Sequence, residues 1–247
     1  MTTDDLTGQM TGLTGELREA FGEDLLSVVL YGSAARSDHQ GSGSDLNIVV
    51  VLRDIGLESL ERGTRPTRAW EAKGNRPLLF FSPEWISRSC DVFPLEFLDI
   101  VAWHRVIHGP DPFAGLVVSS ENLRLQCESE IKTKLIHLRT GYIAFHEDAG
   151  QLARLMAASF APIVTLCRGV LRLAGREVPS TAHEVIRLGA ELCGFDPAPF
   201  DDVAAVKRGG PAAASLGMKA LFKNYCAQVE AMARAVDAGL PANGAKR

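Results

Sequence analysis

Two short polar motifs near the N-terminus contain the residue types that could bind a phosphate and a metal ion. Gly32 and Ser33 follow the apolar run SVVLY, and Asp45 and Asn47 lie at the start of a second apolar run, LNIVVVL. A glycine lets backbone N–H groups approach a phosphate, and a serine hydroxyl adds a donor. Asp45 and Asn47 are two apart, so on a strand they face the same side, where their oxygens could hold Mg²⁺. Together these residues predict a site for a nucleoside triphosphate and its metal.

Each motif by itself has an ordinary structural explanation. A lone Gly-Ser pair is more typical of a simple turn between a strand and a helix. Asp45 could cap the start of a strand, and Asn47 could bond to neighbouring backbone. Arg36, which could supply positive charge, and Ser44 are the further residues expected to bind the nucleotide.

The elements that must position these motifs alternate along the first half of the chain. Four runs are expected to be strands: residues 25–30, 45–52, 76–81 and 94–101. Helices are expected at residues 11–21 and 57–72, the second one broken or shortened by Gly63 and Pro66. A further helix should start at Pro83, with Ser82 as its N-cap. Strands separated by helical segments predict a mixed α/β sheet.

The β pattern disappears after residue 115, and helical patterns follow. Four helices are expected: residues 121–145, 152–173, 181–193 and 213–238. The segment 196–202, which is rich in proline and aspartate, is expected to be a break between two of them. The predicted fold is therefore an α/β domain over residues 1–115, followed by an all-α helical bundle over residues 116–247.

Composition narrows the class of protein. Hydrophobic residues make up 46% of the 247 residues and charged residues 23%, which is ordinary for a soluble globular protein. The net charge of −4 shows no basic excess, which disfavours nucleic acid as a partner. The five cysteines are scattered and form no C-x-x-C pair, as is usual in a reducing compartment. No signal-peptide pattern and no run of about 18 apolar residues is recognised. We therefore expect a cytoplasmic protein without a membrane segment; a homodimer is possible.

The two motifs together resemble the signature of the DNA polymerase beta-like nucleotidyltransferase superfamily. That signature is a strand ending in Gly-Ser, a loop, and Asp-x-[Asp/Glu] on the next strand, and residues 25–52 match it best. The α/β domain followed by helices resembles two-domain proteins of the kanamycin and streptomycin nucleotidyltransferase type. The resemblance implies Mg²⁺-dependent transfer of a nucleoside monophosphate from an NTP to an acceptor hydroxyl. ATP is the favoured NTP. A small-molecule acceptor is favoured over RNA or protein.

The resemblance also implies a third carboxylate on a later strand, as metal ligand or general base. Glu96 is favoured and Asp99 is the alternative, because the run PLEF resembles the segment that carries the catalytic glutamate. Asp45, Asn47 and Glu96 would then be the metal ligands, with Asp45 and Glu96 the catalytic residues. Asn47 departs from the family pattern, since an asparagine offers one neutral oxygen and no charge. Three hypotheses follow: an altered transferase, which is favoured, a nucleotide binder without turnover, and a degenerate domain used for interaction.

One further pattern lies in the helical half. Arg139 and His146 resemble the loose R-x(4–6)-H pattern of HEPN ribonuclease bundles. Two residue types at a variable spacing carry little information, so ordinary helix-surface residues are favoured.

Overall fold

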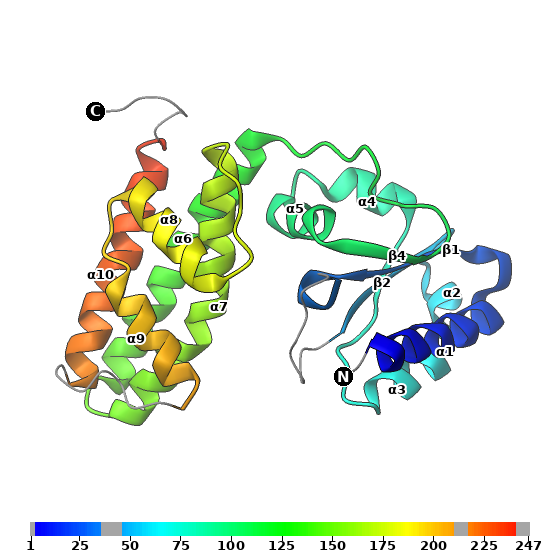
Figure 1. Ribbon diagram of the computed structural model, residues 1–247, viewed down its shortest axis with the longest axis horizontal. Coiled ribbons are helices and arrows are strands. Elements are labelled where there is room, and N and C mark those ends of the chain that lie inside the picture. The colour runs from blue at the N-terminus through cyan, green and yellow to red at the C-terminus, as the bar shows by residue number, and fades with distance from the viewer. Residues whose placement is uncertain (1–2, 36–45, 210–216, 241–247) are drawn as a thin grey trace. The chain divides into compact units, whose positions relative to one another are not determined.

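The strands of the N-terminal half form one mixed sheet. The computed structural model describes residues 3–35, 46–209 and 217–240. Within these residues the strands are β1 (Leu25–Tyr31), β2 (Asn47–Leu52), β3 (Leu79–Phe81) and β4 (His104–His108). Their order is β3-β2-β1-β4, with β1 antiparallel to β2 and β4, and β3 parallel to β2. The mixed α/β sheet predicted from the sequence is confirmed (Figure 1).

Helices cover one face of this sheet with an extended apolar core. These helices are α1 (Thr3–Phe21) and α3 (Thr64–Glu71). Leu17 and Trp70 pack with Leu30, Ile48 and Val50, all of them buried. Fully burying side chains of this size is worth about 1.5–3 kcal/mol each, which holds the helices on the sheet.

The opposite face of the sheet is covered by α4 (Pro83–Ser89) and α5 (Pro94–Ala102). Ile86, Phe97 and Ile100 pack on Val29 and Val49. Since both faces are covered, β1 and β2 are continuous apolar runs rather than alternating ones. Helix α4 begins as predicted, because the Ser82 hydroxyl accepts a hydrogen bond from the Trp85 N–H at 3.1 Å.

The expected strand at residues 94–101 is wrong, because this segment is helix α5. Pro94 occupies the first turn of the helix, where a backbone N–H would have no partner within the helix, so its absence costs nothing. Phe97 and Ile100 lie three residues apart, on the buried side of the helix. The apolar residues on either side of Glu96 suggested strand alternation, and a short run of this kind does not distinguish a strand from a helix. The fourth strand is β4, which the sequence analysis did not identify.

The expected helix at residues 57–72 is divided in two. Helix α2 spans Leu57–Glu61 and α3 starts at Thr64, so the break falls beside Gly63 as anticipated. Two short 3₁₀ turns, Gly22–Asp24 and Gly32–Ala35, flank β1.

The C-terminal half is helical. Its described helices are α6 (Ser120–Phe145), α7 (Ala149–Leu173), α8 (Ala182–Cys193), α9 (Ala198–Lys207) and α10 (Met218–Asp237). Helix α7 contacts the other four. Helix α9 corrects the prediction of a break at residues 196–202: the Asp196 carboxylate accepts the N–H of Ala198 and so helps to start a helix.

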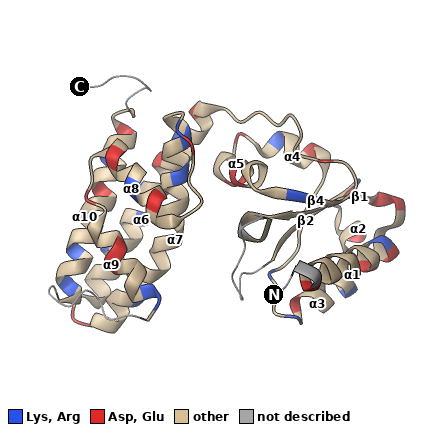
Figure 2. Ribbon diagram, viewed as in Figure 1, with Lys and Arg blue, Asp and Glu red and all other residues tan. Residues whose placement is uncertain are grey.

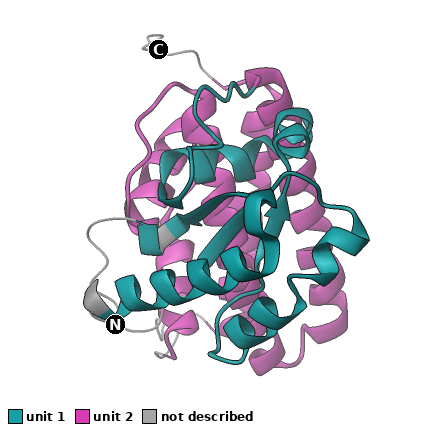
Figure 3. Ribbon diagram, turned by 90° about the vertical axis from the view of Figure 1, so that its right-hand side faces the viewer, with its two compact units in different colours: residues 1–118 teal, residues 119–247 magenta. Residues whose placement is uncertain are grey.

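The chain divides into two compact units, residues 1–118 and 119–247 (Figure 3). We call them unit 1 and unit 2. The boundary predicted from the sequence, after residue 115, falls close to this one.

Helix α7 is long and apolar enough to cross a membrane, with a mean hydropathy of 1.4 in its best window. The sequence analysis did not anticipate such a segment. Half of that window is buried within the structure, which is also how the core helix of a soluble bundle looks.

Candidate functional site

The turn after β1 is built on a glycine in a left-handed conformation. Gly32 has φ +79°, which side chains other than hydrogen rarely allow. Its N–H donates to the carbonyl of Trp103 at 2.9 Å, just after α5. The turn is thereby tied to the end of α5. This N–H already has a partner, so Gly32 would help to bind a phosphate by leaving space rather than by donating.

Asn47 lies over this turn. It is the first residue of β2 and pairs with Tyr31 across the antiparallel ladder. A Cβ added to Gly32 would lie 3.2 Å from Asn47 Nδ2, so the amide occupies the space beside the glycine. Alternation along β2 puts Asn47 on the face of Val49 and Val51, which α4 and α5 cover. The structure thus brings together Gly32 and Asn47, as the sequence motif predicts.

Several predicted site residues cannot be placed. Asp45, Ser44 and Arg36 lie outside the described residues. Ser33 belongs to the 3₁₀ turn Gly32–Ala35. The roles predicted for these residues remain predictions.

The two candidates for the third carboxylate lie on helix α5 instead of a strand. Glu96 is exposed in the first turn of the helix, whereas Asp99 is partly buried one turn later. Three residues apart on a helix, they share one side, whereas a strand would point them to opposite faces. Asp99 lies about 6 Å along the helix from Trp103 and Glu96 about 10 Å. Asp99 is therefore the candidate nearer, along α5, to the end that binds Gly32.

None of the strands in the described residues carries an aspartate or glutamate. In Figure 2, β1 and β2 are free of acidic and basic colour. On β3, Leu79 pairs with Val49 and so shares the face of Asn47, with its side chain 38% exposed. An apolar residue therefore occupies the neighbouring strand where a carboxylate could have faced the site. Within residues 3–35, 46–209 and 217–240, no group of three or more His, Cys, Asp or Glu side chains is arranged to hold a metal ion.

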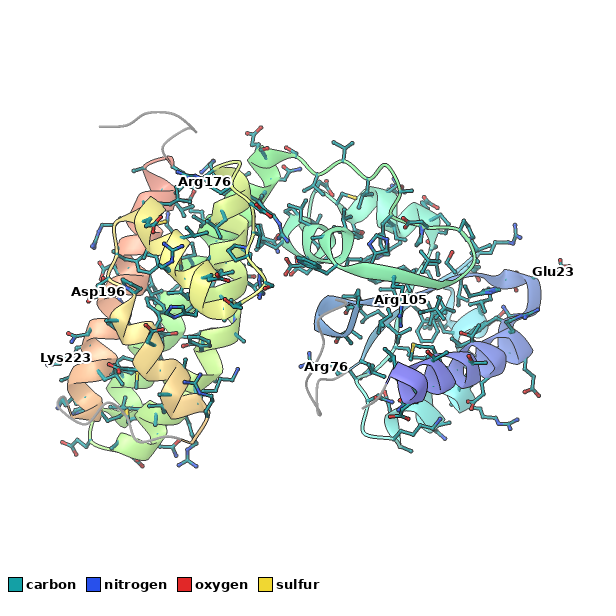
Figure 4. All side chains as sticks on the ribbon, viewed as in Figure 1. Glu23, Arg76, Arg105, Arg176, Asp196 and Lys223 are labelled. Carbon is teal, nitrogen blue, oxygen red and sulfur yellow. The ribbon has the colours of Figure 1, made fainter. Side chains whose placement is uncertain are left out.

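The sequence analysis missed two polar residues beside Asn47. Tyr31 lies between Asn47 on β2 and His104 on β4, so the three side chains share one face across the sheet. Burial raises the pKa of the Tyr31 phenol, and the nearby Arg76 guanidinium opposes that rise. Arg76 is exposed and labelled in Figure 4. The sequence shows only that Arg76 stands shortly before a predicted strand. The order of the strands, which the sequence does not give, is needed to infer that Arg76 lies near Tyr31.

His104, the first residue of β4, is held by two polar contacts. Its Nδ1 lies 3.1 Å from the carbonyl oxygen of Ile100, and its Nε2 lies 3.2 Å from a carboxylate oxygen of Asp111. The ring also packs edge-on against Phe113. These contacts fix the start of β4 next to the end of α5.

Unit 1 is thus a mixed sheet with a Gly-Ser turn after its central strand β1, and unit 2 is helical. No protein-family model matches the chain, and no curated protein sequence does. Among solved structures, the chain is similar to spectinomycin adenyltransferase AAD(9) from Enterococcus faecialis, determined with ATP and spectinomycin. The TM-score is 0.55 at 12% identity, over 93% of this chain and 98% of that one. At this identity the likeness shows the fold, and the fold class predicted from the sequence is confirmed.

Proposed function

We propose that unit 1 binds a nucleoside triphosphate, in the first place ATP, at the turn between β1 and β2. The observation that carries the proposal is the position of the Asn47 amide beside Gly32, at the turn that the family resemblance assigns to the phosphates. The fold likeness to AAD(9), a protein determined with ATP, supports the choice of nucleotide. Tyr31 shares the face of Asn47, and the Arg76 guanidinium lies near enough to the Tyr31 phenol to lower its pKa, so a phosphate could accept from both.

The donor set fits one Mg²⁺ that arrives with the nucleotide. Asp45 would supply the carboxylate and Asn47 a neutral oxygen. Mg²⁺ is commonly held by one or two carboxylates together with substrate phosphates, so this set is sufficient for one ion. A second ion would need a further strand carboxylate, and the described strands have none. When bound, the ion would neutralise part of the triphosphate charge.

Transfer of a nucleoside monophosphate to an acceptor hydroxyl is the second candidate function. It is favoured by Asp99 and Glu96 on α5, whose end is bonded to the Gly32 turn. One of them could take the acceptor proton as the hydroxyl attacks the α-phosphorus in line and pyrophosphate leaves. AAD(9) was determined with spectinomycin, so a small molecule is the preferred acceptor class. Binding without rapid transfer ranks first here because the described strands carry no aspartate or glutamate that could hold a second metal ion.

The proposed location is the cytoplasm, since all five cysteines are free. A homodimer remains a proposal of the sequence analysis, and nothing in the site depends on it.

Titration calorimetry tests the binding proposal. ATP should bind to the wild type in the presence of Mg²⁺ and lose most of its affinity in EDTA. Asp45→Ala should reduce the affinity by at least about tenfold, because it removes the charged metal ligand. Asp54→Ala, an exposed carboxylate beyond the end of β2, is the matched control and should leave binding unchanged.

Absence of metal-dependent ATP binding by the folded wild type overturns both candidate functions. Pyrophosphate release with a panel of aminocyclitol and aminoglycoside acceptors would place transfer ahead of binding alone.

A further inference from the structure

Unit 2 contains a pocket of its own between α6 and α10. Its volume is about 410 Å³, which falls within the range of roughly 300–1,000 Å³ usual for small-molecule sites. The pocket is lined by Arg139, Tyr142 and Ile143 of α6 and by residues of α10, namely Phe222, Lys223, Cys226, Ala227 and Glu230. None of them belongs to unit 1, so the pocket is separate from the proposed nucleotide site.

The wall of the pocket is apolar and flat. The rings of Tyr142 and Phe222 stack with their centroids 5.2 Å apart and an interplanar angle of 22°. Ile143, also on the wall, has 77% of its side chain exposed. Phe222 is buried beneath Tyr142, so the accessible apolar surface is that of Ile143 and part of the Tyr142 ring. Leaving a large aliphatic side chain such as Ile143 in water is unfavourable, and a flat apolar body would cover it.

The charges around the pocket are unbalanced. Glu230 receives two guanidinium groups, Arg139 at 3.2 Å and Arg234 at 3.3 Å. Lys223, labelled at the surface of α10 in Figure 4, forms no ion pair with a residue in the described part of the chain. Of the lining residues, two cations, Arg139 and Lys223, therefore stand against one carboxylate, Glu230. The guanidinium of Arg139 keeps N–H donors beyond those used by Glu230.

Arg139 and His146, the two residues of the R-x(4–6)-H pattern, have different partners in the structure. Arg139 is paired across to α10, and His146 Nδ1 lies 3.3 Å from the carbonyl oxygen of Ile143 on its own helix. Arg139 lines the pocket, whereas His146 does not.

We propose that this pocket binds a small amphipathic anion, a flat apolar ring system that carries one carboxylate. The ring system lies on Ile143 and on the half-buried ring of Tyr142, which stacks on the buried Phe222, and the carboxylate is placed between Arg139 and Lys223. A charge-assisted bond to Arg139 is strong because the guanidinium matches the two carboxylate oxygens. A cationic ligand meets the like charges of Arg139 and Lys223 and is rejected.

Cys226 provides a reporter inside the pocket. Burial raises the pKa of its thiol, and the Arg139 guanidinium opposes that rise. Cys90, Cys127 and Cys167 are buried, and burial raises the pKa of Cys193 to about 12. Iodoacetamide at about pH 8.5 should therefore modify Cys226 before the other cysteines, since the thiolate is the reacting form.

The test uses 2-naphthoate, its neutral amide and 2-naphthylmethylammonium as probes with the full chain. Calorimetry should show naphthoate binding about tenfold more tightly than the amide, because the charge-assisted bond is absent from the amide. Naphthoate should slow alkylation of Cys226. Arg139→Gln and Lys223→Gln should each weaken binding by about tenfold, while Lys219→Gln, an exposed lysine one turn away, should not.

Three outcomes overturn the proposal. The first is no binding of naphthoate at about 1 mM, an affinity too weak for a built site. The second is equal binding of all three probes, or an equal effect of Lys219→Gln and Lys223→Gln. The third outcome combines two results: no probe binds to the wild type, and Ala227→Trp, which fills the pocket, changes the sedimentation coefficient. That result would assign the pocket to a contact between copies of the chain.

Discussion

The amide of Asn47 and the α-carbon of Gly32 occupy adjacent space, so that a Cβ on Gly32 would come to 3.2 Å from Asn47 Nδ2. The two residues lie far apart in the sequence and meet because β1 and β2 are antiparallel neighbours. Asn47 therefore limits the space beside the Gly32 turn.

Gly32→Ala should destabilise the protein. The residue has φ +79°, a conformation that costs an alanine about 1–2 kcal/mol, and the new Cβ would press on Asn47. Urea unfolding measures the loss in free energy of unfolding. Gly12→Ala is the control, since it lies exposed in α1 with nothing within 4 Å of the added Cβ; it should stabilise the helix by up to about 1 kcal/mol. Equal effects of the two substitutions would contradict the strain argument.

Asn47→Asp should increase the affinity for Mg²⁺-ATP by about tenfold, because it adds a unit of charge beside the metal. In EDTA the same substitution should weaken ATP binding, since the new carboxylate repels the phosphates. Calorimetry with and without Mg²⁺ measures both effects. A gain that is independent of the metal would show that residue 47 does not act through an ion.

Leu79→Glu in the Asn47→Asp background should produce or raise pyrophosphate release. Leu79 pairs with Val49 on the face of the sheet that carries Asn47 and is 38% exposed, so a glutamate is tolerated there and adds a carboxylate on the side of the proposed site. A coupled assay with ATP and an aminocyclitol acceptor measures the rate. Leu57→Glu in the same background is the control, because Leu57 is 80% exposed in helix α2, outside the sheet. If both double variants release pyrophosphate equally, the added carboxylate does not act from β3.

The stability of unit 2 should fall as the pH rises above about 8.5, the ordinary pKa of a cysteine thiol. Burial raises the pKa of the Cys193 thiol to about 12, so the folded state keeps a proton that the unfolded chain loses. The stabilisation is complete below the unfolded pKa and is lost as the pH rises toward the folded one, by at most about 1.4 kcal/mol per pH unit for one group. In Cys193→Ala, the free energy of unfolding should therefore fall less steeply between pH 8 and 10. Urea unfolding under reducing conditions measures it at each pH. An identical slope in the variant would mean that Cys193 does not contribute.

Local sequence patterns predicted those elements whose signals are local. The apolar runs of β1 and β2, the Ser82 cap of α4 and the long helices of unit 2 follow from residue types within a few positions of one another. Residues 94–101 and 196–202 were misassigned for the same reason. Their local patterns fit two structures equally, and the choice was made by packing of Phe97 and Ile100 on the sheet and by the start of α9 at Asp196.

By itself, the sequence determined that a Gly-Ser turn and a polar pair stand at the ends of two buried strands, and that Asn replaces a carboxylate in that pair. Only the tertiary structure decided that the Gly32 N–H donates to Trp103, that Leu79 pairs with Val49 on the face of the sheet that carries Asn47, and that Arg139 forms an ion pair with Glu230. Each of these contacts joins segments far apart in the chain. Their free energy depends on how whole helices and strands pack, which no short stretch of sequence encodes.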